Sequence, residues 1–420
     1  MCSITSEIGD TWIFGIASDP VKLARFRIAT NLRSQCISSG QCDPNESHVW
    51  QFSRILLKGA EHTWGLDQKI AIKPYIASNW SNSDLQSLLP TPSFVSFVES
   101  WYRQRRMAIE DALELLYPHP LFFQIRDEFA RQLTVPPQPH ASKSWISFAP
   151  SNLPQSFSLP NGDFIAFNAT NGGISALSLG GKSYASPTSP LALLQYSTYD
   201  ESDYLHYAES YNYLFPVIID KYDQMKLHID QYGATHSIVN PTLKQVLVST
   251  SDQSFYLELS FSEELVTYAG APTTVWLLVD VAGPSLNLTL TVYNKTATRL
   301  PEAMFLRFVP PPLAPSYSAD AWMMRKLAEW VDPADIVTGG AKRLHSVSSG
   351  ISFANQIFVQ PIHTPLVCFG TPTSFPTPLT KEPVWADGAS FILWDNIWNT
   401  NYPQWTIDTE YVFRFKMDFR

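Results

Sequence analysis

Seven residues, Glu61-His62-Thr63-Trp64-Gly65-Leu66-Asp67, bring two carboxylates, an imidazole and an indole together. An imidazole between two acids can bind a divalent cation or move protons, and a neighbouring tryptophan offers a flat face to a sugar ring. Gly59 precedes this stretch and is expected to end a helix, because glycine adopts the left-handed conformation without steric cost. The alternative is a polar loop that Trp64 anchors to the core. Residue types alone favour this alternative, because one histidine makes no metal site.

Two further groups of residues are candidates for a functional site. Glu7, Asp10 and Trp12 combine carboxylates with an indole near the N-terminus, but a loop packed by Trp12 at the entry to a helix explains them equally well. In residues 394–401 asparagines alternate with tryptophans and could contact sugar hydroxyls. An asparagine-rich turn at the end of a strand is the equal alternative there.

The composition limits the class of protein. The chain has 420 residues, of which 45% are hydrophobic and 16% charged, so it is globular and long enough for two domains. Its formal net charge of −9 argues against nucleic acid as a partner, because phosphate binding needs clustered Lys and Arg. No apolar run approaches the roughly 20 residues needed to cross a bilayer, so no membrane partner is expected.

The N-terminus and the cysteines bear on location. The first residues have neither a basic start nor an apolar core, so they are no secretory signal. The chain as given therefore reads as cytoplasmic, with a secretory or vacuolar location as the alternative if the N-terminus is truncated. Cys36 and Cys42 are close enough in sequence to bridge a loop, and a reduced pair is equally expected.

Helical periodicity dominates the first third of the chain. Asp19-Pro20 is a helix start, with Asp as the cap and Pro in the first turn. Further helices are expected at residues 46–58, at 92–116 and from Pro120 onward. Short connections favour an antiparallel helical bundle. The run Val135-Pro136-Pro137-Gln138-Pro139 cannot continue a helix, so the boundary between a first domain, 1–135, and the remainder is placed there.

Residues 136–420 show the alternation of half-buried strands. Apolar side chains at 255, 257, 259 and 261 alternate with polar ones, and the pattern returns at 286–292 and 411–419. One helical interruption is expected at 319–330. So many strands exceed one simple sandwich, which predicts stacked antiparallel sheets. The predicted fold is thus α+β and multidomain, a helical bundle followed by a large antiparallel β-sandwich region with two stacked sheet subdomains as one possibility.

Five segments, taken together and in this order, resemble a known family. They are Glu7-Ile8-Gly9-Asp10-Thr11-Trp12, Ala17-Ser18-Asp19-Pro20, Glu61-His62-Thr63-Trp64-Gly65, Arg299-Leu300-Pro301-Glu302-Ala303 and Leu393-Trp394-Asp395-Asn396-Ile397-Trp398-Asn399-Thr400-Asn401-Tyr402-Pro403. The family they resemble is glycoside hydrolase family 38, the α-mannosidase group, and within it an uncharacterised fungal and bacterial branch. The resemblance implies a metal-dependent retaining glycosidase built from an α/β domain, a helical bundle and large β domains.

The resemblance also implies roles for particular residues. In the family, zinc is bound by a His and an Asp of a His-x-Asp motif, by the aspartate nucleophile and by a later His, which His62 resembles. Glu61 or Asp67 could orient the imidazole through its second nitrogen. The residues expected beside the sugar are Asp10, Trp12, Glu61, Trp64 and Asp67.

The α/β domain that supplies the nucleophile has no counterpart here, so residues 1–135 are expected to hold the bundle and a remnant of the catalytic-domain edge. Retaining hydrolysis needs two carboxyl groups about 5 Å apart, and the sequence identifies no such pair. The expected function is the C-terminal portion of a metal-dependent glycoside hydrolase-like protein for an α-linked sugar, inactive as given. Zinc would bind only if the missing ligands were supplied. The alternative is a non-catalytic carbohydrate-binding or structural protein.

Overall fold

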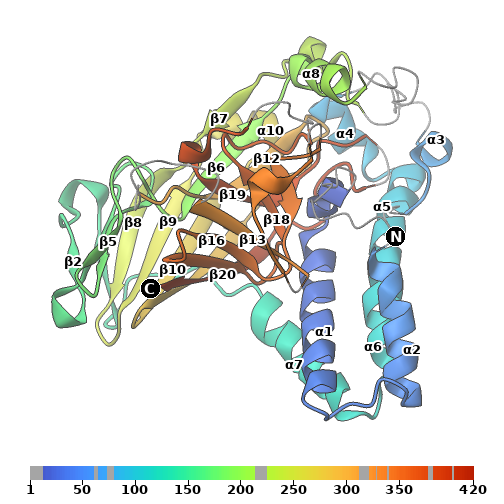
Figure 1. The fold of residues 1–420 in the computed structure, drawn as a ribbon. Helices are drawn as coiled ribbons and strands as arrows, with labels where there is room; N and C mark the ends of the chain where they lie inside the picture. The colour runs from blue at the N-terminus through green and yellow to red at the C-terminus, as the bar shows by residue number, and fades with distance from the viewer. Residues whose placement is uncertain are drawn as a thin grey trace.

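The structure is a computed structural model of the chain. It describes residues 13–60, 65–72, 80–212, 225–311, 321–327, 329–337, 340–376, 382–399 and 402–420. Long helices stand on one side of a β-rich body (Figure 1). Within the described residues, no helix combines the length and apolar character needed to cross a membrane.

The helices begin where capping residues place them. Asp19 caps α1 (Pro20–Ser38) by accepting a hydrogen bond from the Lys22 main-chain nitrogen, which confirms the predicted start. The other elements of the helical part are η1 (Ile13–Ser18), α2 (Ser47–Leu56), η2 (Leu57–Ala60), α3 (Gln68–Ala71), α4 (Asn82–Leu88), α5 (Pro92–Arg105), the π-helical turn η4 (Arg106–Glu110), α6 (Asp111–Glu114) and α7 (Pro120–Leu133). The segment predicted as one helix over 92–116 is therefore interrupted by a π-helical turn.

Helices α1, α2, α6 and α7 enclose an apolar core of their own. α1 lies beside α7 and α2 beside α6, and Val49, Phe52, Ala112 and Ile125 are buried between them. Cys36 and Cys42 are joined by a disulfide at the end of α1. Gly59 does not end a helix in the left-handed conformation as predicted. It lies buried in η2, where a side chain would meet the Phe26 ring 2.8 Å from its Cβ position.

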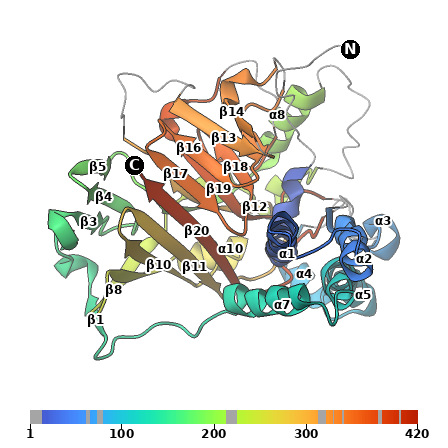
Figure 2. The same cartoon turned by 60° about the horizontal axis from the view of Figure 1, so that its bottom comes forward.

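The strands form three sheets among the described residues, and every pair within them is antiparallel (Figure 2). The largest has the order β1 (Trp145–Phe148), β8 (Thr242–Ser249), β9 (Ser254–Ser260), β10 (Thr274–Ala282), β11 (Ser285–Tyr293), β20 (Tyr411–Phe419), β17 (Ile357–Pro361), β16 (Gly350–Phe353), β13 (Trp322–Lys326) and β14 (Glu329–Val331). The second has the order β15 (Leu344–Ser346), β18 (Leu366–Phe369), β19 (Ala389–Asp395), β12 (Glu302–Phe308), β6 (Leu193–Thr198) and β7 (Ser237–Val239). The third is β2 (Phe157–Ser158), β3 (Phe164–Phe167), β4 (Ile174–Leu179) and β5 (Lys182–Ala185).

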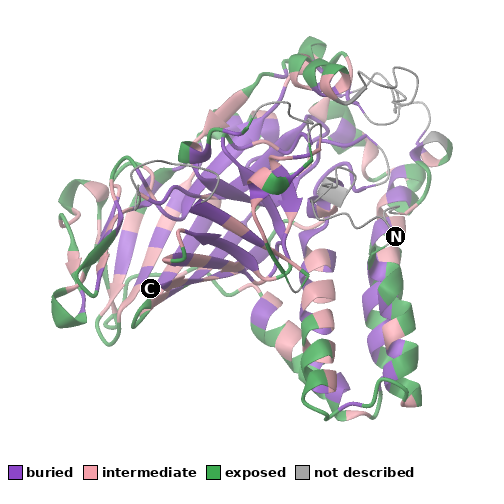
Figure 3. Ribbon diagram, in the orientation of Figure 1, coloured by how far each residue is buried: buried purple, intermediate pink, exposed green. Residues whose placement is uncertain are grey.

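The three sheets share the largest apolar cluster of the protein. Leu257 of the first sheet, Phe391 of the second and Leu177 of the third all belong to it. Burial is concentrated where the sheets face one another, and exposed residues line the outer sides of the helices (Figure 3). Helices followed by antiparallel sheets confirm the α+β prediction. The finer terms, bundle and sandwich, remain interpretations of this arrangement.

The predicted helical interruption at 319–330 is wrong for the residues that the structure describes there. Residues 322–326 form β13 and pair with β16 and β14. Trp322 and Met324 are buried while Met323 and Arg325 are partly exposed, which is the alternation of a strand. Position in the sheet overrides the helical propensity of these side chains.

A second apolar cluster joins the helical and β parts. Phe97 and Trp101 of α5 pack against Trp405, with ring centroids 5.9 and 5.0 Å from it. Leu300 and Ile392 of the β region belong to the same cluster. The division into 1–135 and 136–420 stays a prediction, and residues on both sides of it share this core.

Candidate functional site

The structure describes few of the site residues predicted from the sequence. Asp10, Trp12, Glu61, His62 and Trp64 lie outside the described residues. Asp67 is exposed and stands just before α3, where its main-chain oxygen accepts hydrogen bonds from the Ile70 and Ala71 nitrogens. Its position is thus that of a helix start. No group of three His, Cys, Asp or Glu side chains within the described ranges could hold a metal ion.

Three of the segments that carry the family resemblance meet beside the second sheet, near η1 (Figure 1). Turn η1 packs against β19. At Gly15 the position of a Cβ atom would lie 2.3 Å from the Tyr402 ring and 2.6 Å from the Trp398 ring. Glycine is therefore required for this close approach, which brings the N-terminal turn onto residues 393–403.

Asn396 links two of the converging segments. Its side-chain oxygen accepts a hydrogen bond from the Glu302 nitrogen at 2.8 Å, and its amide group donates to the oxygens of Thr298 and Leu300 at 2.9 and 3.0 Å. Asn396 and Asn399 are both buried. The strand-end turn is therefore the correct interpretation of these two asparagines, because their side chains do not reach a sugar at the surface. Asn401 lies outside the described residues.

The end of the first predicted stretch lies at the same place. At Gly65 the Cβ position would be 2.6 Å from the Trp101 ring, and Trp101 in turn contacts Trp405. Gln404 donates a hydrogen bond to Gln68. Residues 65–68 are thus held directly against the chain that follows the 393–403 segment.

An open cavity of about 610 Å³ adjoins this junction. Leu66, Ser100, Tyr102 and Arg103 are among its lining residues. Ser100 also donates a hydrogen bond to the Phe97 oxygen and accepts one from the Leu66 nitrogen at 2.9 Å. The cavity combines an aromatic ring, hydroxyls and guanidinium groups, which are the groups that contact sugar hydroxyls and C–H faces. It lies next to the stretch that the sequence singled out.

Arg105 forms the buried wall of this cavity. Its guanidinium lies 2.6 Å from one carboxylate oxygen of Asp19 and 2.8 Å from one of Asp408. Burial alone would lower the pKa of Arg105, but the two carboxylates outweigh it and raise the pKa above its usual value. Asp19 is fully buried, so this carboxylate serves the ion pair and the cap of α1 and is not free to act on a substrate.

Two other carboxyl groups are buried in the converging segments. Glu302 pairs with Lys295 at 2.7 Å, and neither side chain is more than 1% exposed. The Lys295 ammonium lies 4.4 Å from the centre of the Trp394 ring. Burial lowers the pKa of Lys295 and raises that of Glu302. This pair is sealed inside the protein.

Asp395 has a different environment. It is fully buried, and neither carboxylate oxygen has a hydrogen-bond partner among the described residues. Burial raises its pKa to about 8, against smaller opposing effects from nearby Ser374 and Lys226. Lys226 donates to the main-chain oxygens of Arg299 and Asn396, and burial lowers its pKa. Burial therefore favours the protonated, neutral form of the Asp395 carboxyl.

The strand register separates the two carboxyl groups. Asp395 pairs with Ala303, so these two side chains lie on the same face of the second sheet. Glu302 adjoins Ala303 in the strand and therefore points to the opposite face. Trp394, which lies beside the Lys295–Glu302 pair, is likewise on the face opposite Asp395. Glu302 and Asp395 thus cannot act together on one glycosidic bond.

The pKa of Asp395 predicts a pH-dependent stability. Its ordinary pKa is 3.8 and its value in the folded protein is about 8, so the unfolded chain ionises first as the pH rises between them. Stability should fall by up to ~1.4 kcal/mol per pH unit across this window. Asp395→Asn removes this loss. The free energy of unfolding of the variant, relative to that of the wild type, should therefore increase from about pH 4 to about pH 8.

Urea unfolding of both proteins across that pH range measures the difference. Asp127→Asn is the control, because Asp127 is 69% exposed and paired only with its neighbour Arg126. A difference between Asp395→Asn and wild type that stays constant with pH would show that Asp395 is ionised in the folded protein.

Glu302 and Asp395 lie in the family-like segments, but the sequence indicates a role for neither. An acidic residue within an otherwise apolar strand is the signal that would have drawn attention to them. Lys226, Lys295 and Arg105 give no comparable signal, because only packing reveals that they are buried.

The family described as "Domain of unknown function (DUF5054)" matches residues 16–285. A comparison with curated proteins finds no match. Among solved structures, an α-mannosidase from Enterococcus faecalis is 10% identical with a TM-score of 0.38, over 89% of this chain and 54% of that one. A protein in glycosyl hydrolase family 38 from Enterococcus faecalis is 11% identical with a TM-score of 0.37, over 95% and 57%. A galactose mutarotase related enzyme from Lactobacillus acidophilus is 11% identical with a TM-score of 0.33, over 63% and 97%. The chain thus spans about half the length of the two Enterococcus faecalis structures.

Proposed function

We propose a carbohydrate-processing role for this chain, which belongs to the DUF5054 family. The role is that of the C-terminal portion of a glycoside hydrolase-like protein acting on an α-linked sugar, a mannoside in the first instance. One observation carries the proposal. The described parts of the segments that resemble family 38 are far apart in sequence but lie together, beside a cavity of about 610 Å³.

The described residues supply a scaffold and one wall of the site, and the buried carboxyl groups of the converging segments form no catalytic pair. Glu99 and Glu110 line the cavity itself, and Glu110 is bound to Arg25. Asp19 is bonded to Arg105, Glu302 to Lys295, and Asp395 lies on the opposite face of the sheet from Glu302. A retaining mechanism needs two carboxyl groups about 5 Å apart on either side of the scissile bond. The proposal therefore assigns the nucleophile and the acid/base to residues outside this set.

The remaining ligands of the zinc ion that the family resemblance implies are likewise assigned to residues outside this set. His62 remains the proposed zinc ligand, but the described residues contain no group of three ligands and do not by themselves fit zinc. Stable zinc sites use four ligands, or three and a water. No catalytic step is assigned to a metal here.

The chain alone is expected to release no aryl alcohol from aryl α-mannosides above the rate without protein, with or without zinc. The reason is that a retaining mechanism without its nucleophile loses the covalent step. Isothermal titration with zinc should give equally weak binding in the wild type and in His62→Ala. His140→Ala, which removes an exposed histidine from the proline-rich connection, is the matched control. Zinc-dependent cleavage by the chain, lost in His62→Ala alone, would contradict this prediction and place the catalytic groups within it.

The alternative is a non-catalytic carbohydrate-binding protein. The observation in its favour is that Asp19 and Glu302 are both bound in buried ion pairs. Binding of an aryl α-mannoside without cleavage, in a protein that also contains any preceding coding sequence, would favour this alternative over the hydrolase.

For location, we favour the secretory or vacuolar alternative over the cytoplasmic one. Cys36 and Cys42 are bonded, and disulfides persist mainly in oxidising compartments. The proposal would be contradicted if the native protein, isolated with its thiols blocked, carried Cys36 and Cys42 in reduced form.

A further inference from the structure

A second cavity lies at the other side of the β-rich body, away from the helices. It has a volume of about 380 Å³ and is formed where four connections and one strand end meet. These are the β2–β3 connection, the β4–β5 hairpin, the β8–β9 connection, the β10–β11 hairpin and the end of β20. In Figure 1 the third sheet, which carries two of them, stands opposite the helical part. The cavity is therefore separate from the site described above.

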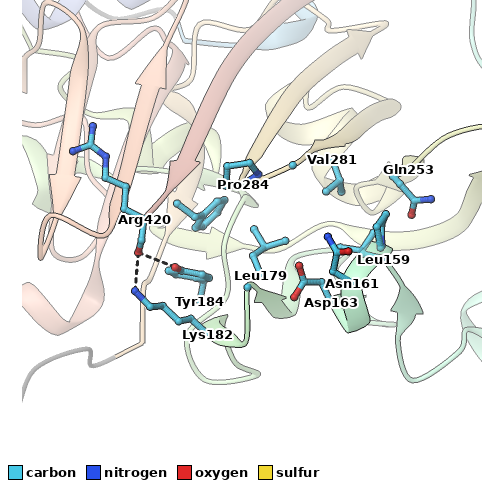
Figure 4. Close-up of a pocket in the computed structure, with 14 residues that line it drawn as sticks. Leu159, Asn161, Asp163, Leu179, Lys182, Tyr184, Gln253, Val281, Pro284 and Arg420 are labelled. Atoms are coloured by element: carbon cyan, nitrogen blue, oxygen red, sulfur yellow. Dashed lines mark hydrogen bonds between the residues drawn. The ribbon is translucent and has the colours of Figure 1, made fainter.

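The floor of this cavity is apolar and partly aromatic. Leu179, Tyr184 and Phe419 line it and are buried. The Tyr184 and Phe419 rings contact each other with centroids 4.8 Å apart. Pro284 extends the apolar surface at the β10–β11 turn (Figure 4). Such a surface suits the C–H face of a ring more than a charged group, because it cannot solvate a charge.

Hydrogen-bonding side chains stand along one side of this floor. Asn161, Asp163 and Gln253 line the cavity, and Figure 4 places the three together, across from Lys182 and Tyr184. None of the three makes a side-chain hydrogen bond within the part of the chain that the structure describes. Two amides and one carboxylate thus offer both donors and acceptors to a ligand.

Main-chain hydrogen bonds hold the turn that carries Asn161 and Asp163. The Leu159 nitrogen donates to the Asp163 oxygen at 2.8 Å, and Asn161 sits between them at a φ of 63°, a conformation that asparagine tolerates well. On the opposite side the Tyr184 hydroxyl donates to the Arg420 main-chain oxygen at 2.9 Å, and Lys182 donates to the same oxygen at 3.3 Å. A preformed pocket of this kind loses little conformational entropy on binding.

We propose that this cavity binds a neutral sugar, one or two pyranose units in length. The apolar floor would take the C–H face of the ring. Asn161, Asp163 and Gln253 would exchange hydrogen bonds with hydroxyls along its edge, the carboxylate accepting from two neighbouring hydroxyls at once. A volume of about 380 Å³ lies at the lower end of the roughly 300–1,000 Å³ typical of small-molecule sites, which limits the ligand to this size.

Charge argues against an anionic ligand. The Lys182 ammonium is engaged with the Arg420 main-chain oxygen, and the Arg420 guanidinium points away from Asn161 and Asp163 in Figure 4. Asp163 lines the same cavity, and its carboxylate repels anions. A phosphate or carboxylate would therefore meet one ammonium that already donates a hydrogen bond, and one repelling carboxylate.

Ligand-observed NMR and isothermal titration with three methyl α-pyranosides, those of mannose, glucose and galactose, test the proposal. Saturable binding of at least one is expected. Asp163→Asn should weaken it about tenfold or more, because hydrogen bonds to a charged acceptor are the stronger ones. Val281→Trp, which fills the cavity without removing a polar group, should abolish it. Asp127→Asn on α7 should leave it unchanged.

The outcomes separate this site from the first cavity, which Tyr102 and Arg103 line. Absence of saturable binding overturns the inference, and so does binding that survives in both Val281→Trp and Asp163→Asn. Loss of binding in Tyr102→Ala, which alters the first cavity, but not in these two variants would place the sugar at that first cavity instead and overturn this inference alone. Tighter binding of inorganic phosphate or glycine than of the glycosides would also overturn it. If circular dichroism shows that Val281→Trp does not fold, the effect of Asp163→Asn on binding decides whether the sugar occupies this cavity.

Discussion

Replacing Lys295 with methionine is expected to lower the free energy of unfolding by about 3–5 kcal/mol, the usual cost of removing one partner from a buried ion pair. The Lys295 ammonium donates to the Glu302 carboxylate at 2.7 Å and to the Gly270 oxygen at 2.8 Å, with no more than 1% of its side chain exposed. Without the Lys295 side chain, the Glu302 carboxyl loses its hydrogen-bond partner whether it is ionised or protonated. Glu302 is fully buried, so water does not take the place of that partner.

A double-mutant cycle tests the origin of this loss. Lys295→Met combined with Glu302→Leu should recover part of the stability, because neither buried charge then remains. Arg126→Met breaks an exposed pair, with side chains 55% and 69% exposed, and is expected to cost less than about 1 kcal/mol. Urea unfolding measures five proteins: the wild type, Lys295→Met, Glu302→Leu, the double variant and Arg126→Met. A loss in Lys295→Met no larger than that in Arg126→Met would contradict the assignment of a buried pair.

The second large effect is expected at Arg105. Arg105→Met should also cost about 3–5 kcal/mol, because it leaves the fully buried Asp19 carboxylate without its partner. The same guanidinium holds Asp408, so the substitution should also loosen the junction between α5 and the chain before β20. Hydrogen exchange should speed up at the start of α1, where Asp19 caps the helix.

Two substitutions on α5 control this experiment. Arg105→Lys should recover only part of the loss, because an ammonium cannot reach both carboxylates with the fork of a guanidinium. Arg103→Met removes an exposed arginine two residues away and should leave the free energy of unfolding within about 1 kcal/mol. Equal losses in Arg103→Met and Arg105→Met would point to the helix itself and not to the ion pairs.

The candidate site could be predicted only in part. The sequence directed attention to residues 61–67 through their types, and the structure places residues 65–68 beside an open cavity. The sequence could not show that Arg105, which lines this cavity, is held there by Asp19 and Asp408. These residues are 86 and 303 positions apart from Arg105, and only folding brings them together.

Local interactions determined what the sequence alone predicts correctly. The start of α1 follows from Asp19 and Pro20, because a cap and a preset φ act within one turn. Strand β9 follows from its alternating residues, because a half-buried strand has a period of two. The order of helices first and antiparallel strands after follows from the same two periods.

Tertiary structure decided everything that depends on partners distant in sequence. Residues 322–326 have helix-forming side chains, yet they pair between two strands and adopt the conformation of the sheet. Glu302 and Asp395 look alike in the sequence, because each is an acid in a family-like segment, and both are buried in the structure. The register of β12 and β19 puts them on opposite faces, one paired with Lys295 and the other without a hydrogen-bond partner among the described residues. A one-residue change in register would put the two acids on the same face, and the pairing of β12 with β19 is a long-range contact that neither strand shows by itself.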